Sequence, residues 1–333
     1  MFSLLFTALG LEAALRIAYH RSMDFSMEMW KYAVQLKRPV SDSKLSFVHR
    51  PNSHAFVMGQ DVSINSQGLR DYEYTVEKPA GVYRILLLGD STILGWGVPM
   101  DETAAKILER ALNAEHVPGY QRFEVINAGV GNYDTIQEVT YYKTRGRYFH
   151  PDLVILVYFI NDPEPVPVEK KIFLIDRSYL VAFLTNRYDG VLRRLGARPD
   201  WKIYYSSLYD DNLPGFQACK AALVELATAT REDHAKLMVA LLPELHQIND
   251  SYPFIAAHQK IKDVLAPERV PILELIDGLR NHGPEITLWV TPLDDHPNGK
   301  ANDLIAAQMQ AAILKDLEAS SEAMQTATTP TGP

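Results

Sequence analysis

The chain of 333 residues has little cysteine and no excess of positive charge, and each shortage excludes a class of protein. Cys219 is its only cysteine, so neither an internal disulfide bond nor a thiolate metal cluster can form. With 33 Lys and Arg against 41 Asp and Glu, the formal net charge is −8, and nucleic acid is not an expected partner. The ten histidines show no HExxH or similar paired spacing, so we predict no metal and no cofactor.

A clear secretory signal is also missing. Residues 1–19 are mostly apolar and carry only Glu12 and Arg16, which stand one helical turn apart and can pair. This length is marginal for a membrane span of about 20 residues, and Arg16 and Arg21 follow the apolar run, whereas a signal peptide has its cations first. Two alternatives remain for residues 1–22. In the first, the segment is a membrane anchor or the remnant of one, and the chain lies in the cell envelope outside the cytoplasm. In the second, it is an amphipathic helix on a soluble cytoplasmic domain.

Hydrophobic residues make up 47% of the chain, which is enough for a large globular core. From Tyr83 onward, short apolar runs alternate with helical stretches, the pattern of a parallel sheet covered by helices. We therefore predict an α/β fold of three layers, with a central parallel sheet of about five strands and helices on both faces. The predicted strands are 83–88, 123–127, 152–158, 236–242 and 270–274, and a covering helix is predicted over 102–113 with Asp101 as its N-cap.

The other segments differ in composition from this main domain at 83–317. Residues 23–82 are polar, aromatic and turn-rich, and we expect an N-terminal lead-in layer with a tight turn between short strands at 65–71. Residues 163–215 open with a proline-rich run and carry many aromatic side chains, which favours either an insertion over the site or a solvent-covering excursion. Residues 318–333 show no periodicity and are predicted to be a disordered tail.

A serine and a distant Asp/His loop stand where acyl-transfer chemistry needs them. Ser91 ends a GDS motif directly after the apolar run 84–88, and ligands collect at the carboxyl ends of strands in open α/β sheets. His296 follows two carboxylates and precedes a proline, so it lies in a loop and suits a general base. Helix capping by Ser91 and an ordinary surface histidine are the alternatives. The segments that follow the strands are 89–91, 127–132, 160–162 and 243–246, with 294–296 later in the chain.

Four separated blocks resemble the SGNH, or GDSL, hydrolase superfamily, in the order that the superfamily has them. The blocks are GDS at 89–91, VINAGVGNYDT at 125–135, IND at 160–162 and LDDH at 293–296. The resemblance spans about residues 83–317 and implies a flavodoxin-like fold and a serine ester hydrolase that needs no cofactor.

The resemblance implies a role for the residues in these blocks. Ser91 takes the place of the nucleophile, and its backbone N–H that of the first oxyanion donor. Asn161 takes the place of the third donor, although Phe159 replaces a glycine of that block. The second donor is a glycine in the superfamily; here Asn132 holds its position and Gly131 precedes it. Either backbone N–H remains a candidate, because any residue but proline has one.

The last block departs most from the superfamily, which has an aspartate three residues before the histidine. Leu293 stands at that place. Asp294 lies two residues before His296 and Asp295 directly before it. A carboxylate two residues away can fold back onto the imidazole more readily than an adjacent one, so we predict Asp294 as the acid of a Ser–His–Asp triad, with Asp295 as the alternative.

These assignments predict a serine esterase in which His296 activates Ser91. The resemblance implies that the substrate is a short acyl ester, an O-acetyl group on a carbohydrate or polysaccharide. One alternative is an O-acyltransferase that uses the same residues to modify an exported glycan, and another is a non-catalytic binding protein on the same fold. The expected partner is an acylated small molecule or glycan, with membrane association through residues 1–19 if that segment is an anchor.

Overall fold

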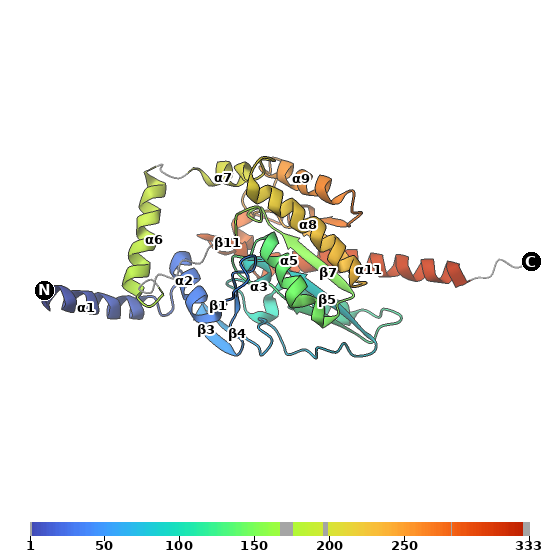
Figure 1. Cartoon of the computed structure of the whole chain (residues 1–333), viewed down its shortest axis with the longest axis horizontal. Helices are drawn as coiled ribbons and strands as arrows, with labels where there is room; N and C mark the ends of the chain where they lie inside the picture. Colours follow the sequence, from blue (N-terminus) through green and yellow to red (C-terminus); the bar gives the residue numbers. More distant parts are fainter. Residues whose placement is uncertain (1, 167–175, 196–198, 281, 329–333) are drawn as a thin grey trace, which may run out of the picture.

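The computed structural model describes residues 2–166, 176–195, 199–280 and 282–328 (Figure 1). Its centre is a parallel sheet with the strand order β6-β5-β7-β8-β9. This is the order of flavodoxin-like doubly wound folds. The predicted fold class is confirmed, and each predicted strand is present within one or two residues of its expected ends. The strands are β5 (Val82–Leu88), β6 (Arg122–Asn127), β7 (Leu153–Tyr158), β8 (Lys236–Leu241) and β9 (Ile272–Glu274).

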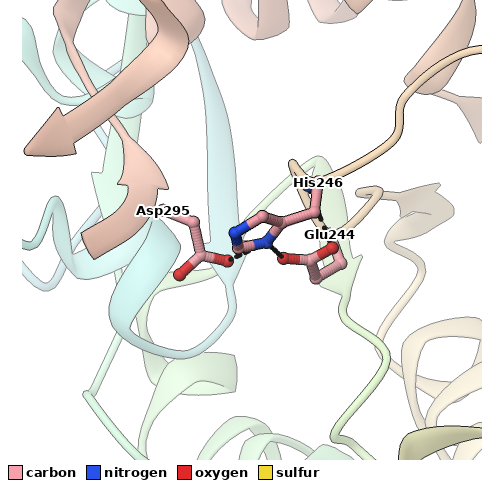
Figure 2. Close-up of side chains that lie close together, drawn as sticks. All are labelled: Glu244, His246 and Asp295. Atoms are coloured by element: carbon pink, nitrogen blue, oxygen red, sulfur yellow. Dashed lines mark hydrogen bonds and ion pairs between the residues drawn. The ribbon is translucent and has the colours of Figure 1, made fainter. Parts of the chain in front are cut away.

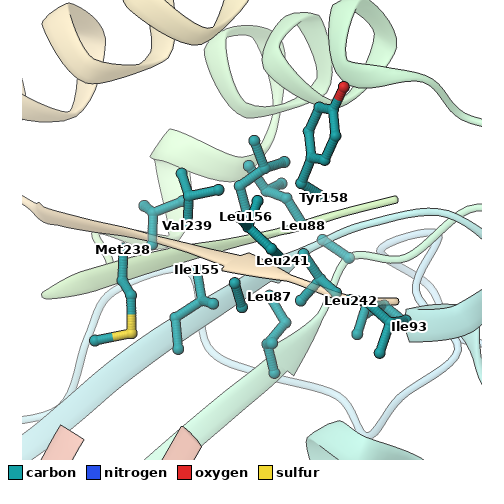
Figure 3. Close-up of a cluster of buried hydrophobic side chains, with 14 of the residues drawn as sticks. Leu87, Leu88, Ile93, Ile155, Leu156, Tyr158, Met238, Val239, Leu241 and Leu242 are labelled. Carbon is teal, nitrogen blue, oxygen red and sulfur yellow. The ribbon is translucent and has the colours of Figure 1, made fainter. Parts of the chain in front are cut away.

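Both faces of this sheet are buried, which is why its strands have near-continuous apolar sequences. Neighbouring side chains alternate between the faces: Leu88 and Leu156 point to one side, and Leu87 and Ile155 to the other (Figure 3). All four are fully buried. The sequence alternation that marks a half-exposed strand is therefore absent from the central strands.

Helices cover the two faces in pairs. α5 (Thr135–Thr144) packs against α8 (Pro214–Glu232), and α4 (Ala104–Ala114) packs against α11 (Gly299–Thr328). On the α8 side, the Tyr158 hydroxyl lies 3.9 Å from the sulfur of Cys219. Beside the sheet lie a further helix, α9 (Ile255–Leu265), and short helical elements: α3 (Ser91–Leu94), η1 (Met100–Glu102), η2 (Gly146–Phe149), α10 (Ile276–Leu279) and η3 (Glu285–Leu288).

The start of α4 corrects the predicted helix over 102–113. The N-cap is Thr103, whose side chain accepts a hydrogen bond from the Lys106 backbone N–H, while Asp101 belongs to η1. Thr103 has the extended backbone that an N-cap requires. Both Asp101 and Thr103 are good capping residues, so the sequence alone did not separate them.

The lead-in layer consists of a helix and two small antiparallel pairs. These elements are α2 (Phe25–Leu36), β1 (Lys37–Pro39) with β2 (Phe47–His49), and β3 (Ser53–Val57) with β4 (Gln60–Ile64). The tight turn predicted at 65–71 is present, with the Gly68 backbone N–H donating to the Asn65 carbonyl at 3.2 Å and a φ of 82° at Gly68. It does not join two short strands, because it follows β4 and the next strand is β5 of the central sheet. The hairpin turn is made by Met58 and Gly59, with φ of 47° and 72°. Two successive positive φ angles suit a tight hairpin, but methionine is not a turn-forming residue and gave no signal.

The described part of residues 163–215 forms two helices that lie in different places. α6 (Tyr179–Arg194) packs against α1 and α2, away from the central sheet, whereas α7 (Trp201–Ser207) stays beside α8 and α9 (Figure 1). Trp201 of α7 packs on Phe254, with ring centroids 5.7 Å apart. Only the second helix is therefore near the carboxyl edge of the sheet.

The N-terminal helix α1 (Phe2–Ala18) extends from the body of the molecule and contacts α6 (Figure 1). Its Glu12 accepts a hydrogen bond from the Ser178 hydroxyl at 2.8 Å and pairs with Arg16 at 2.7 Å. Leu4, Phe6 and other apolar side chains of this helix are exposed. Among the described residues, no helix combines the length and the apolar character needed to cross a membrane.

The predicted disordered tail at 318–333 is wrong over most of its length. α11 continues to Thr328, and residues 329–333 lie outside the described part. Alanine, glutamate, methionine and glutamine are good helix formers, and they allow the helix to continue although the segment has no apolar periodicity.

Candidate active site

The carboxyl ends of β5, β6, β7 and β8 open onto one pocket of about 430 Å³. The pocket lies where the strand order reverses between β5 and its two neighbours, the usual ligand site of such sheets. Its size falls within the range of about 300–1,000 Å³ for small-molecule sites. The pocket is lined by residues from each of the segments that follow these strands, among them Ser91, Asn132, Asn161, His246 and His296.

Ser91 is placed by a sharp turn between β5 and α3. A side chain at Gly89 would put its Cβ 2.5 Å from Cγ1 of Ile93, so the close approach of strand and helix requires glycine. Asp90 caps α3 by accepting a hydrogen bond from the Thr92 backbone N–H at 2.8 Å. The turn leaves Ser91 at the first position of the helix, with its hydroxyl directed into the pocket wall formed by His296.

His296 and Asp294 come from a small hairpin near the end of the domain, β10 (Trp289–Thr291) with β11 (Asp294–Pro297). The Ser91 Oγ lies 2.9 Å from Nε2 of His296, and Nδ1 of the same ring lies 2.6 Å from Oδ1 of Asp294. The other Asp294 oxygen accepts a hydrogen bond from the Trp96 indole at 3.0 Å. These contacts fix the tautomer in which Nδ1–H donates to Asp294 and Nε2 accepts from the serine hydroxyl.

The electrostatics of this pair follow from burial and mutual attraction. Burial favours the neutral imidazole, but the hydrogen bond and charge of Asp294 outweigh it and raise the pKa of His296 above 6.5. Burial likewise favours a neutral Asp294, but the bond and charge of His296 outweigh it and lower the pKa of the carboxyl below 3.8. Asp294 is therefore ionised wherever His296 has to accept a proton.

The two candidates for the second oxyanion donor have different surroundings. The backbone N–H of Gly131 donates to the Tyr32 hydroxyl at 2.9 Å. Lys37 donates to the Gly131 carbonyl at 2.5 Å and to the side-chain oxygen of Asn132 at 3.0 Å. Asn132 lines the pocket and has a φ of 65°, a conformation that asparagine tolerates better than most residues. Since Gly131 is already engaged, the geometry favours the N–H of Asn132.

Asn161 reaches the pocket from the end of β7. Its side-chain oxygen is buried and has no hydrogen-bond partner among the described residues. The following residue, Asp162, is buried and accepts hydrogen bonds from the Thr135 hydroxyl at 2.9 Å and from the Phe159 backbone N–H at 3.3 Å. These bonds hold the turn after β7, from which Asn161 lines the same pocket as Ser91.

Three residues that hold this site were not found from the sequence: Tyr32, Lys37 and Trp96. None lies in a block of the superfamily, and each contacts a site residue from 94 or more positions away. Their patterns show nothing beyond those of ordinary aromatic and charged residues. Only the fold reveals their contacts.

Within the described part of the chain, two groups of side chains offer the atom types that metals bind. Glu244, His246 and Asp295 form one, and Asp294, Asp295 and His296 the other, with ligand atoms within 4.8 Å of one another in each. In both groups Nδ1 of the histidine bonds directly to a carboxyl group. Figure 2 shows this for the first group. Paired histidines and carboxylates account for both clusters without an ion. Asp295, the alternative triad acid, faces His246 at 3.5 Å and not Nδ1 of His296.

The fold and this arrangement together are of the kind found in serine hydrolases on an α/β scaffold. No family model and no curated protein match the chain. Solved structures do. TesA is 16% identical in sequence to this chain, with a TM-score of 0.44, and the match covers 70% of this chain and 99% of TesA. A lipolytic-type protein of the G-D-S-L family from Desulfitobacterium hafniense is 11% identical with a TM-score of 0.44, over 68% and 98%.

A two-domain esterase active on acetylated mannans, crystallised with mannopentaose, is also similar. It is 15% identical with a TM-score of 0.46, and the match covers 72% of this chain and 50% of that esterase. The chain therefore spans half of that two-domain protein. The four sequence blocks that resemble SGNH and GDSL hydrolases meet at one place in the fold, because Ser91, Asn132, Asn161 and His296 all line the pocket.

Proposed function

We propose that the chain is a serine esterase of the SGNH type that removes a short acyl group, an acetyl group in particular, from a carbohydrate. The observation that carries this proposal is the hydrogen-bonded series from Ser91 through His296 to Asp294, with distances of 2.9 and 2.6 Å, on the wall of a ligand-sized pocket. An alcohol, a base and an orienting acid in this order are what acyl transfer through serine requires.

The reaction follows from these contacts. His296 accepts the Ser91 proton as Oγ attacks the ester carbonyl, and Asp294 stabilises the imidazolium that forms. The backbone N–H groups of Ser91 and Asn132 and the side-chain amide of Asn161 stabilise the negative oxygen of the tetrahedral intermediate. His296 then gives its proton to the departing alcohol oxygen. Water, activated by the same imidazole, releases the acyl group and restores the serine.

The proposed substrate class has two supports. An esterase of similar fold acts on acetylated mannans, and the pocket of this chain is lined by Trp201 and Tyr205, whose rings offer flat apolar surfaces of the kind that sugars stack on. The residues that carry the chemistry would serve an acyltransferase equally well, so the product decides between hydrolysis and transfer.

The test uses the purified full chain with p-nitrophenyl acetate and a serine-directed fluorophosphonate. We expect hydrolysis and labelling by the wild type and neither by Ser91→Ala. Ser207→Ala, which changes an exposed serine of α7, is the matched control and should behave like the wild type. Labelling that persists in Ser91→Ala contradicts the assignment of the nucleophile. With a polysaccharide acceptor present, acetylated glycan in place of free acetate would show transfer.

A further inference from the structure

A second pair of histidine and carboxylate lies on the wall of the same pocket, and the mechanism above gives it no task. Glu244 and His246 come from the loop after β8, and Asp295 comes from β11 (Figure 2). The buried Glu244 carboxylate bonds to Nδ1 of His246 and accepts the His246 backbone N–H at 3.0 Å. Nδ1 also lies 3.5 Å from Oδ2 of Asp295.

The ring of His246 is held in one orientation. It packs on Trp289 with ring centroids 4.3 Å apart and on Trp201 with centroids 5.3 Å apart. The Trp289 indole donates to the Leu245 carbonyl at 3.2 Å, which ties the loop to the hairpin that carries His296. Yet 41% of the His246 side chain is exposed, and its Nε2 forms no hydrogen bond with the described part of the chain. An oriented hydrogen-bonding group therefore faces the pocket.

The protonation of Glu244 suits this role. Burial, and after it the neighbouring Asp295, raise the pKa of Glu244 to about 10. Glu244 therefore keeps its proton at neutral pH and can donate it in its hydrogen bond to Nδ1 of His246. The groups left open to a ligand are Nε2 of His246 and the carboxylate of Asp295, which is 35% exposed. Together they can accept from and donate to hydroxyl groups.

The charge of the pocket limits what can bind there. Asp90, Glu164, Glu244 and Asp295 line it, and in the described part of the chain no lysine or arginine does. An anionic ligand would meet no lysine or arginine among these lining residues and would be repelled by the carboxylate of Asp295. A ligand rich in hydroxyl groups and without charge fits the same surface, and the ring of Trp201 forms part of the pocket wall that such a ligand would contact.

The position of Asp295 next to His296 shows which part of a substrate this surface would meet. His296 must protonate the departing alcohol oxygen, so that oxygen lies beside the imidazole during the reaction. Resting on the proposed esterase function, we propose that His246, Asp295 and Trp201 form a subsite that binds the hydroxyl groups of an uncharged sugar on the alcohol side of the ester, with Glu244 positioning His246.

The experiment compares two acetyl esters that differ only in the alcohol to which the acetyl group is attached. p-Nitrophenyl acetate has no sugar, whereas O-acetylated xylo-oligosaccharides have one. For His246→Ala and Asp295→Asn we expect kcat/KM on the oligosaccharide to fall about 10- to 100-fold, mainly through KM, because each removes a hydrogen bond to bound substrate. On p-nitrophenyl acetate the change in His246→Ala should stay within about 3-fold, whereas Asp295→Asn, which also acts on His296, is compared by the ratio of its losses on the two substrates. His54→Ala, in the exposed β3–β4 hairpin, is the control.

Further measurements separate the possible failures. Equal losses on both substrates would overturn the subsite, as would unchanged activity of both variants on the oligosaccharide. Loss of both activities with EDTA and their return with Zn²⁺ would also overturn it in favour of a metal site. The rate of fluorophosphonate labelling shows that each variant keeps a folded nucleophile site. If the wild type is not labelled at Ser91, the esterase proposal itself has failed.

A second comparison tests the charge argument. The wild type should deacetylate the neutral xylo-oligosaccharides at least about 10-fold more efficiently than acetylated oligogalacturonates, because the latter carry carboxylates into an acidic pocket. Asp295→Asn should narrow this preference. A preference for the anionic substrate would contradict an uncharged sugar as the ligand.

Discussion

At the residue scale, the contact of 2.6 Å between His296 and Asp294 sets the pH range in which the proposed base can work. Burial alone would lower the pKa of His296, but the bond to Asp294 raises it above 6.5. Only the neutral imidazole can accept the serine proton. Activity on p-nitrophenyl acetate should therefore rise with pH along a limb whose midpoint lies above 6.5, and kcat/KM measured from pH 5 to 9 gives that midpoint.

The matched variants for this prediction are Asp294→Asn and Asp295→Asn. Asp294→Asn should lower kcat by roughly 10³- to 10⁴-fold, because the imidazole loses its orienting acceptor and the stabilisation of its charge. Its residual activity should have a midpoint at lower pH than the wild type. Asp295 makes a smaller contribution to the pKa of His296, so Asp295→Asn should move the midpoint less. Equal effects of both variants would contradict Asp294 as the orienting acid.

A second prediction at this scale concerns Asn161. If its amide stabilises the oxyanion, Asn161→Ala should lower kcat by roughly 10²- to 10³-fold, about 3–4 kcal/mol, and change KM little. The buried oxygen of this side chain has no hydrogen-bond partner among the described residues, so the substitution should cost little stability. Steady-state kinetics together with thermal unfolding measure both quantities. Wild-type turnover in Asn161→Ala would contradict this role.

How much of the site the sequence reveals can be judged from single residues. Ser91, Asn161 and His296 follow from motifs and their order, because each stands directly after a strand or in a defined loop. The spacing of Asp294 and Asp295 from His296 favours Asp294, and the bend of the hairpin brings that carboxylate to Nδ1. The choice between Gly131 and Asn132 needed the Tyr32 hydroxyl, which occupies the Gly131 N–H from 99 positions away.

At the scale of elements, the lead-in layer supports the proposed oxyanion site. Lys37, at the start of β1, is buried between the rings of Tyr32 and Phe47 and donates to the turn at Gly131 and Asn132. Its ammonium group fixes the side chain of Asn132 and thus the direction of the neighbouring N–H. Lys37 is therefore a positioning residue for the proposed reaction.

Replacing Lys37 by methionine tests this role. We expect kcat to fall about 10-fold with little change in KM, because the bond that orients the donor acts on the intermediate more than on bound substrate. Lys37→Arg, which keeps a donor, should recover part of the loss. Lys44→Met, at an exposed position before β2, is the control for removing a lysine. A fall in the melting temperature without the change in kcat would show a structural role only.

Elements were predictable where one physical signal dominates. β5 and β7 are buried along their whole length and have nearly continuous apolar sequences, so they stand out in the sequence. The predictions failed where the local signal is ambiguous or missing. Asp101 and Thr103 are both suitable N-caps for α4, and Met58 stands at a hairpin turn that favours glycine or asparagine. For α11, helix propensity extends the element beyond its apolar periodicity, a contribution that a pattern search does not detect.

At the scale of the whole molecule, a layer of carboxyl groups is buried beneath the pocket. Asp90, Asp134, Glu138 and Asp162 are all nearly inaccessible, and neither oxygen of Glu138 has a hydrogen-bond partner among the described residues. Burial, followed by the neighbouring carboxylates, raises the pKa of Glu138 and of Asp162 well above their ordinary values. The native protein therefore keeps these protons at a pH where the unfolded chain releases them.

This difference makes stability depend on pH. Above about pH 4.5, the ordinary pKa of glutamate, the unfolded chain loses the Glu138 proton while the native protein retains it, so the free energy of unfolding falls as pH rises, by about 1.4 kcal/mol per pH unit for one proton. Glu138→Gln has no such proton, so this contribution to the pH dependence of the free energy of unfolding is lost. Thermal unfolding at pH 5 and pH 8 should therefore show the variant gaining stability over the wild type at the higher pH. Other groups, such as His49, whose pKa burial lowers to about 3, affect both proteins alike and cancel in the difference. A constant gap between the two proteins would mean that Glu138 is ionised in the native state, stabilised by a cation or water that the buried layer admits.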